Sequence, residues 1–86
     1  MPILEANSER VLCRLFGIAE NPKETAIRKQ LWHLAEMLLP VKSAGDFNQA
    51  MMELGALVCT PASPGCSECP LRDVCQARQW NQQDRI

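Results

Sequence analysis

Long apolar runs, tyrosine and an excess of basic residues are all missing from this 86-residue sequence. No segment approaches the ~20 consecutive apolar residues that a helix needs to cross a bilayer, so a membrane-spanning protein is excluded. Nine Lys and Arg against ten Asp and Glu give a net charge of −1, so no overall positive field attracts nucleic acid. Near the C-terminal end, Arg72, Arg78 and Arg85 are the only candidates for a local basic patch.

Secretion is not indicated, because the first ten residues, MPILEANSER, contain neither a basic start with an apolar core nor a cleavage site. We therefore expect a reducing, cytoplasmic compartment. The sequence has five cysteines, and four of them lie between positions 59 and 75. In such a compartment, this crowding and the odd total indicate metal binding rather than disulfides.

Apolar residues at helical spacing predict three helices, and no strand is predicted. The first should span residues 8–16, with Asn7 or Ser8 as its cap and Gly17 as a left-handed stop. The stripes expected to face the core are Val11, Leu12, Leu15 and Phe16 in the first helix, Ile27, Leu31, Leu34, Ala35 and Leu38 in the second, and Phe47, Ala50, Met51, Leu54 and Val58 in the third.

The ends of the second and third helices are predicted from capping signals. The second should begin with Asn21 as N-cap and Pro22 in the first turn, and Pro40 should end it. The third should begin at Asp46, with Gln49 reaching back to complete a capping box, and should continue to the first clustered cysteine.

The remaining third of the sequence predicts irregular structure. The stretch TPASPG holds two prolines and a glycine and predicts a loop, and Pro70 should open one short helical turn. The expected fold is therefore all-α, with three helices followed by an irregular four-cysteine loop. We expect a helical part over 1–58, a metal loop over 59–75 and a polar tail over 76–86 that frays from residue 78.

The spacing of the four clustered cysteines is Cys59-x6-Cys66-x2-Cys69-x5-Cys75. A cubane cluster needs four thiolates that converge on four corners, so a turn-rich loop has to fold around it. Structural zinc is the alternative, but zinc sites generally use two close cysteine pairs, and only Cys66 and Cys69 form one here. The spacing predicts four ligands to a metal centre. It differs from both common ferredoxin patterns, which argues against electron transfer.

Other reactive or aromatic side chains are assigned structural roles. Cys13 should be a small buried hydrophobic residue on the inner side of the first helix. His33 has no spaced partner and receives no functional role. Trp32 and Trp80 could stack on bases, but anchoring a small core is the commoner use of such residues.

Three stretches resemble the A/G-specific adenine DNA glycosylases of the helix-hairpin-helix glycosylase superfamily, from about residue 2 to 75. The family's segment with the catalytic aspartate is similar to PILEANSERVL, and its long helix is similar to QLWHLAEMLLP. Its last helix and iron-sulfur loop are similar to DFNQAMMELGALVCT followed by CSECPLRDVC. The cysteine spacing alone is shared with endonuclease III relatives, whereas FNQAMMELGALVC and the first stretch favour the adenine-specific branch.

The resemblance implies a role for each matching residue. The four clustered cysteines match the ligands of a [4Fe-4S] cluster, which orders a DNA-facing loop and does not perform the hydrolysis. Glu5 matches the catalytic aspartate, which stabilises the positively charged sugar as adenine leaves. Asn7 matches an asparagine that positions this carboxylate. The implied substrate is double-stranded DNA with adenine mispaired with guanine or 8-oxoguanine.

The sequence also departs from the family pattern. Glu5 is one methylene longer than aspartate, Ser8 replaces an apolar residue, and TPASPG lacks the basic residues of the family's loop. The family's general acid, helix-hairpin-helix and adenine pocket lie upstream of the matched region. We therefore expect a truncated, cluster-bearing fragment that is inactive alone, and that either pairs with a separately made N-terminal half or is related to the family by descent only, as a gene fragment without a present function. The alternative is a non-catalytic iron-sulfur or zinc module that binds DNA weakly or binds a protein.

Overall fold

A computed structural model describes residues 4–39, 42, 44–83 and 86, and within these residues the regular secondary structure consists of helices alone. The α-helices are α1 (Ala6–Phe16), α2 (Thr25–Leu38), α3 (Ala44–Leu57) and α4 (Gln76–Gln79), and a short 3-10 helix, η1, covers Cys66–Glu68. The predicted all-α fold class is confirmed. No helix in the described ranges is long and apolar enough to cross a membrane.

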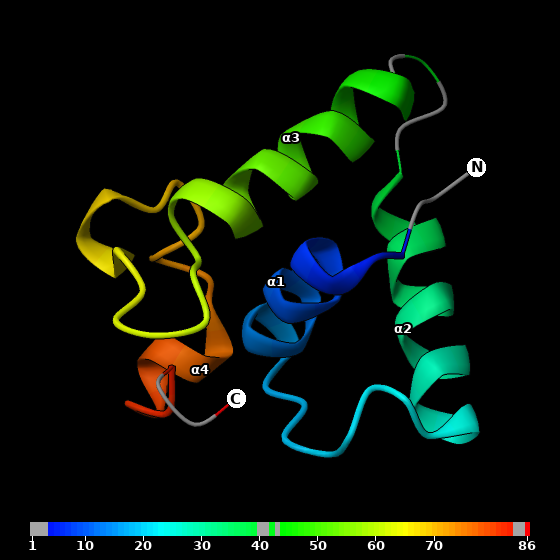
Figure 1. Cartoon of the computed structure of the whole chain (residues 1–86), viewed down its shortest axis with the longest axis horizontal. Helices are drawn as coiled ribbons and strands as arrows, with labels where there is room; N and C mark the ends of the chain where they lie inside the picture. Colours follow the sequence, from blue (N-terminus) through cyan, green and yellow to red (C-terminus); the bar gives the residue numbers. More distant parts are fainter. Residues whose placement is uncertain (1–3, 40–41, 43, 84–85) are drawn as a thin grey trace.

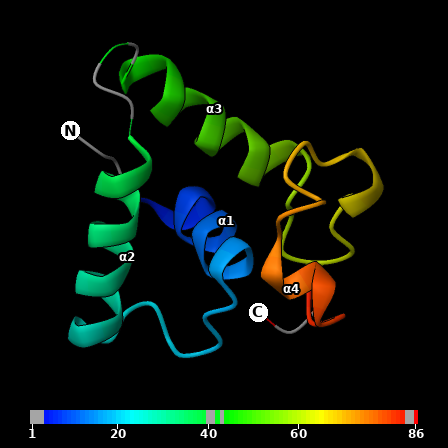
Figure 2. The same cartoon turned by 180° about the vertical axis from the view of Figure 1, so that it is seen from behind.

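Helix α1 is the central element of the fold. It packs against α2, α3 and α4, and Figures 1 and 2 show it between α2 on one side and the cysteine loop with α4 on the other. The buried core contains residues from α1, α2 and the segment between them. These residues are Leu12, Cys13, Ile18, Leu31 and Ala35.

The start of α1 differs from the prediction. Glu5 is the N-cap, and neither Asn7 nor Ser8 takes that position. The Ser8 backbone N–H donates to Glu5 Oε1 at 2.7 Å, and the Glu5 backbone N–H donates to Ser8 Oγ at 3.0 Å. This is a capping box with the acid and the hydroxyl exchanged. The predicted cap was wrong because Ser8 serves as the third residue of the helix.

The predicted stop at Gly17 is confirmed. Gly17 adopts left-handed φ and ψ of 69° and 36°, and the Ile18 N–H then donates to Cys13 O at 2.8 Å. A Cβ atom at Gly17 would lie 2.5 Å from the Trp80 ring, so this position needs glycine for space as well as for conformation.

Helix α2 begins later than predicted, at Thr25 with Glu24 as N-cap. Asn21 instead closes a turn, because its Oδ1 accepts from the Lys23 N–H at 3.0 Å and its carbonyl accepts from the Glu24 N–H at 3.1 Å. At the other end, the Leu39 N–H donates to Ala35 O at 3.0 Å. The predicted stop at Pro40 lies outside the described residues.

Helix α3 begins at Ala44, before the predicted start at Asp46. Gln49 does not complete a capping box, because its Nε2 donates to Glu53 Oε1 one turn further on, at 3.0 Å. The buried residues of α3 are Asn48 and Gly55. A Cβ atom at Gly55 would lie 2.4 Å from Asn7 O, so glycine permits the close crossing of α3 over α1.

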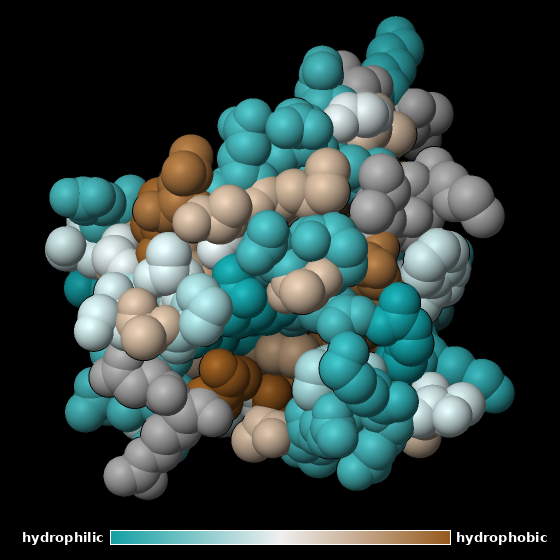
Figure 3. Space-filling view, viewed as in Figure 1, coloured by the Kyte–Doolittle hydropathy of each residue, from teal (hydrophilic) through white to brown (hydrophobic). Residues whose placement is uncertain are grey.

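The apolar stripe predicted for α3 is largely outside the core. It lines an open groove together with Leu57, which is 77% exposed, and Leu71. Figure 3 shows apolar residues over α3 on a face that is otherwise mostly hydrophilic. The other large apolar residues at the surface are Phe16, Met37, Leu38, Val74 and Trp80. The core is therefore small, as expected for a chain of this length.

The C-terminal third differs most from the prediction. Residues 70–74 form turns instead of a helical turn that opens at Pro70. The fraying predicted from residue 78 was wrong for residues 78–79, because Gln76–Gln79 form α4 with Ala77 completely buried. Since α4 packs on α1, a short polar segment becomes helical through tertiary contact.

Candidate metal centre

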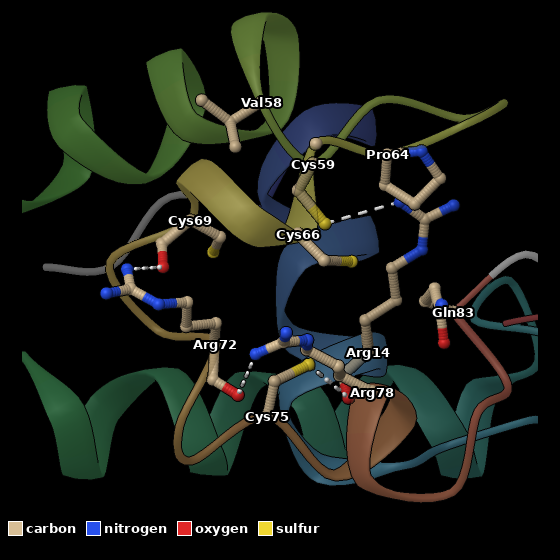
Figure 4. Close-up of a pocket in the computed structure, with 11 residues that line it drawn as sticks. Arg14, Val58, Cys59, Pro64, Cys66, Cys69, Arg72, Cys75, Arg78 and Gln83 are labelled. Carbon is tan, nitrogen blue, oxygen red and sulfur yellow. Dashed lines mark hydrogen bonds between the residues drawn. The ribbon is translucent and has the colours of Figure 1, made fainter.

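The four clustered cysteines line one cavity of about 290 Å³ that is partly open to solvent. Figure 4 shows their side chains around a common space, below the end of α3. Cys59 follows α3, Cys66 opens η1, Cys69 caps the C-terminus of η1 and Cys75 caps the N-terminus of α4. The other lining residues are Arg14, Val58, Pro64, Gly65, Arg72, Arg78 and Gln83.

Backbone hydrogen bonds bend the loop around this cavity. The Cys59 N–H donates to Leu54 O at 2.7 Å, so the first cysteine continues directly from the last turn of α3. The Gly65 N–H donates to Val58 O at 2.8 Å and closes the loop that was predicted from its prolines and glycine. The Cys69 backbone N–H donates a hydrogen bond to Cys66 O at 3.1 Å, which keeps these two cysteines close together.

The thiols influence one another electrostatically. Burial raises the pKa of the Cys66 thiol above its ordinary value, and the Cys75 and Cys59 thiols raise this pKa further, whereas Arg78 lowers it. Repulsion of this kind between thiolates is relieved when a bound cation shares them. No group of three or more His, Cys, Asp or Glu side chains in the described part of the chain is arranged to hold a metal ion.

Two sulfur atoms accept hydrogen bonds. The Leu71 backbone N–H donates to Cys69 Sγ at 3.4 Å, and Arg14 Nη1 donates to Cys59 Sγ at 3.3 Å. Donors of this kind stabilise thiolates and form the outer shell of many metal centres. The Cys75 thiol instead acts as a hydrogen-bond donor, to Arg14 O at 3.4 Å.

Arg10 and Arg14 connect α1 to the cysteine loop. Arg10 Nε donates to Cys59 O at 2.8 Å, and its Nη2 donates to Gly55 O at 2.5 Å and Asn7 Oδ1 at 2.9 Å. Sequence reasoning missed both arginines. The signal was the spacing of Asn7, Arg10 and Arg14, which puts them on one helical face that a simple amphipathic pattern assigns to solvent.

The two residues matched to the catalytic segment lie at the start of α1. The Glu5 carboxylate is half-buried and accepts from Ser8, and Asn7 accepts from Arg10. The carboxylate is therefore positioned by Ser8, for which the sequence predicts only a possible capping role in the first helix. Through Asn7, Arg10 and Cys59, a continuous set of contacts joins this end of α1 to the cavity.

The remaining candidates fall into three groups. Arg72 and Arg78 line the cavity, and Arg85 lies outside the described residues. Cys13 is buried as predicted, and burial together with Glu9 and Glu20 raises its pKa to about 11. His33 is exposed, Trp32 is half-buried, and Trp80 packs on Gly17 although 55% of it is exposed.

Comparisons with known proteins first define the class of the fold. A solved structure of a thermostable thymine-DNA glycosylase superimposes with a TM-score of 0.78 and 33% identity, over 92% of this chain and 36% of that one. The chain thus has the fold of part of a helix-hairpin-helix DNA glycosylase. No family model matches the sequence.

The sequence then identifies the particular family. The adenine DNA glycosylase of Homo sapiens is 48% identical over 98% of this chain, and those of Arabidopsis thaliana and Buchnera aphidicola (strain Sg) are 41% and 46% identical over 99% and 88% of it. The predicted resemblance is confirmed: over nearly its whole length the chain is homologous to adenine DNA glycosylases. It spans 15%, 14% and 22% of the length of these three relatives.

Proposed function

We propose that this chain is the cluster-bearing segment of an adenine DNA glycosylase, which removes adenine mispaired with guanine or 8-oxoguanine. In this proposal Cys59, Cys66, Cys69 and Cys75 hold a [4Fe-4S] cluster, and Glu5 supplies the carboxylate beside the reacting sugar. The observation that carries it is the convergence of all four thiols on one cavity that is joined to α1 by two arginines.

The arrangement of the thiols supports an iron-sulfur cluster over zinc. A zinc ion binds four thiolates at about 2.3 Å, so their sulfur atoms lie within ~4 Å of one another. The cysteines here surround a cavity, and only Cys66 and Cys69 form the close sequence pair that zinc sites generally use twice. A cluster is wider than an ion and contacts each thiolate at a separate corner. The thiolates also require the reducing, cytoplasmic compartment expected from the sequence.

The cluster, when bound, serves as a structural crosslink between its four ligands. Residues 59–75 would form the cluster loop, and residues 1–58 would form the helical part of the domain. The described side chains of Cys59 and Cys69 already accept hydrogen bonds that favour thiolates. Helix α4 follows the loop and packs on α1, so the folded part of the chain continues past residue 75 to residue 79 at least.

The position of Glu5 supports a role in stabilising positive charge. Its carboxylate lies at the N-terminus of α1 and accepts a hydrogen bond from the Ser8 backbone N–H. An ionised carboxylate near the anomeric carbon stabilises the oxocarbenium-like sugar formed as the base leaves. Arg10 binds Asn7 Oδ1 and the carbonyl oxygen of Gly55 near the end of α3, so the cluster loop would help to fix the start of α1.

The rest of a glycosylase domain has to supply most of the DNA affinity. The chain carries a net charge of −1, and phosphate contacts dominate non-specific binding. The loop over residues 60–65 adds no basic side chain. Double-stranded DNA is thus proposed as the partner of the assembled domain, with the missing helices supplied by the same protein or by a separate N-terminal half.

One observation favours the second candidate function, a non-catalytic metal module that binds DNA weakly or binds a protein. The Glu5 carboxylate already serves as the N-cap of α1 through its bond with the Ser8 N–H. This structural use could be its only use, since glutamate also extends further than the family's aspartate. Function would then persist without the carboxylate.

A chimaera can separate the two candidates. Residues 1–75 would replace the homologous segment of an adenine DNA glycosylase, and single-turnover excision of adenine opposite 8-oxoguanine would be measured. We expect slow excision that Glu5→Gln abolishes and Glu5→Asp accelerates, because catalysis is sensitive to displacements of about 1 Å. Equal excision by the Glu5→Gln chimaera and its parent would contradict a catalytic role for Glu5 and favour the non-catalytic module.

A further inference from the structure

Arg14 is a buried arginine that contacts both the first and the last clustered cysteine. Only 2% of the residue is exposed. Its guanidinium donates to Cys59 Sγ at 3.3 Å, and its backbone oxygen accepts from the Cys75 thiol at 3.4 Å. Figure 4 shows the side chain extending along the cavity toward Cys59.

The guanidinium also joins two segments that are distant in sequence. Nη1 donates to Thr60 O at 2.6 Å, Nη2 donates to Pro61 O at 3.0 Å and Nε donates to Ile86 O at 3.3 Å. One side chain therefore connects α1 to the loop that follows Cys59 and to residue 86. Loss of this side chain would leave three carbonyls without their donor.

The buried charge of Arg14 lies next to the metal site. Burying a guanidinium is costly unless it is paired with a negative charge; the peptide carbonyls of Thr60 and Pro61 carry none, and Ile86 O belongs to the last residue of the 86-residue chain. Among the described residues the recorded ion pair is that of Arg28 with Glu9, and it does not involve Arg14. The remaining partner is Cys59 Sγ, which is negatively charged when it serves as a metal ligand.

Given the cluster proposed above, on which this inference rests, we propose that Arg14 is a positioning residue for the metal centre. Its guanidinium fixes the Cys59 thiolate and offsets part of the negative charge of the four ligands. Two consequences follow from these contacts. The bound cluster is lost more slowly, because one ligand is held in place, and its reduction potential is higher, because a nearby cation favours the more negative, reduced state.

Arg72 provides a matched control on the same cavity. It is also an arginine that lines the cavity, and its Nη1 donates to the backbone oxygen of a cysteine, Cys69, at 3.0 Å. Unlike Arg14, Arg72 is exposed, so water screens its charge. A general effect of removing positive charge near the cavity would appear in both variants, whereas the proposed role belongs to Arg14 alone.

The test uses the 86-residue chain purified without oxygen, as wild type, Arg14→Gln, Arg14→Lys and Arg72→Gln. Iron per chain, the rate of iron loss to a ferrous chelator, the reduction potential and the helical circular dichroism are measured for each. We expect Arg14→Gln to lose iron about 10–100-fold faster, the range typical of outer-shell substitutions, and to have a lower potential. Arg14→Lys should also lose iron faster, because an ammonium group cannot make the several hydrogen bonds of the guanidinium. Its reduction potential should stay close to that of the wild type, because the positive charge is kept. Arg72→Gln should match the wild type.

The outcomes separate this inference from the proposed cluster. Iron in the wild type with unchanged iron loss and potential in Arg14→Gln would overturn the role of Arg14 and leave the cluster intact. A wild type without iron would overturn both. Should Arg14→Gln lose its helical signal, Arg14→Lys decides: wild-type iron loss in that variant would contradict a positioning role, and faster loss with retained potential would support it.

Discussion

A local capping box holds the N-terminal end of α1, whereas Arg10 and Arg14 further along the helix bind carbonyls of distant segments. Glu5 and Ser8 exchange hydrogen bonds between the backbone N–H of each residue and the side chain of the other. Arg10 and Arg14 bond to carbonyls that lie 45 to 72 positions away. The candidate carboxylate thus depends on a local motif, and the candidate metal centre depends on the assembled fold.

The largest effect is expected at Arg10, where the two regions meet. Arg10→Ala removes the donors to Gly55 O and Cys59 O, and unsatisfied partly buried carbonyls cost stability. We expect the free energy of unfolding to fall by about 2–3 kcal/mol, measured by urea denaturation. The exposed Arg72 is the control, and an equal loss in Arg72→Ala would show that the long-range bonds of Arg10 have no special weight.

The next effect is expected at the C-terminal end of α1. Gly17→Ala places a Cβ atom in a left-handed conformation and against Trp80, so we expect a loss of about 1–2 kcal/mol and displacement of α4. Gly45→Ala is the matched control, because a Cβ atom there meets nothing within 4 Å and should favour the helix. Thermal unfolding followed by tryptophan fluorescence measures the stability of both variants. If both substitutions changed the stability in the same direction, the contact of Gly17 with Trp80 would not explain the effect.

A smaller effect is expected at the local end. Ser8→Ala removes the hydroxyl that accepts from the Glu5 N–H, and loss of a capping interaction costs about 1 kcal/mol. The unfolding free energy should fall by that amount, while the iron content of the purified chain should stay unchanged. Loss of iron in Ser8→Ala would show that the two ends of α1 are not independent.

The smallest effect concerns Cys13, which lies in the core between the two ends. Its pKa is raised to about 11 by burial, Glu9 and Glu20, so the folded state keeps the proton that the unfolded state releases near pH 9.0. The stabilisation is therefore complete below about pH 9 and is lost as the pH rises toward 11. Unfolding of wild type and Cys13→Ala between these pH values tests this, and parallel pH curves would contradict it.

The sequence predicts the part of the site that depends on spacing. The intervals between Cys59, Cys66, Cys69 and Cys75 predict that they act together, and in the structure all four line one cavity. Their role as ligands stays a prediction. Helical periodicity likewise predicts α1, α2 and α3, although the caps were misplaced, because several polar residues near each start compete for the same backbone amides.

The parts that could not be predicted depend on distant partners. Arg10 and Arg14 resemble ordinary surface residues of an amphipathic helix, and their acceptors are carbonyls of α3 and of a loop whose path the sequence does not reveal. Helix α4 could not be predicted either, because a four-residue, mostly polar segment becomes helical only through its packing on α1, where Ala77 is buried. Tertiary contacts decide both features.

The most direct test of the account is a metal analysis of the 86-residue chain, purified without oxygen as wild type and as Cys69→Ser. Iron, sulfide and zinc are counted, and a visible spectrum is recorded. The account predicts about four irons and four sulfides per wild-type chain, with a broad brown absorbance that Cys69→Ser loses. One zinc per chain without colour would contradict it and would make a zinc-stabilised binding module the better description.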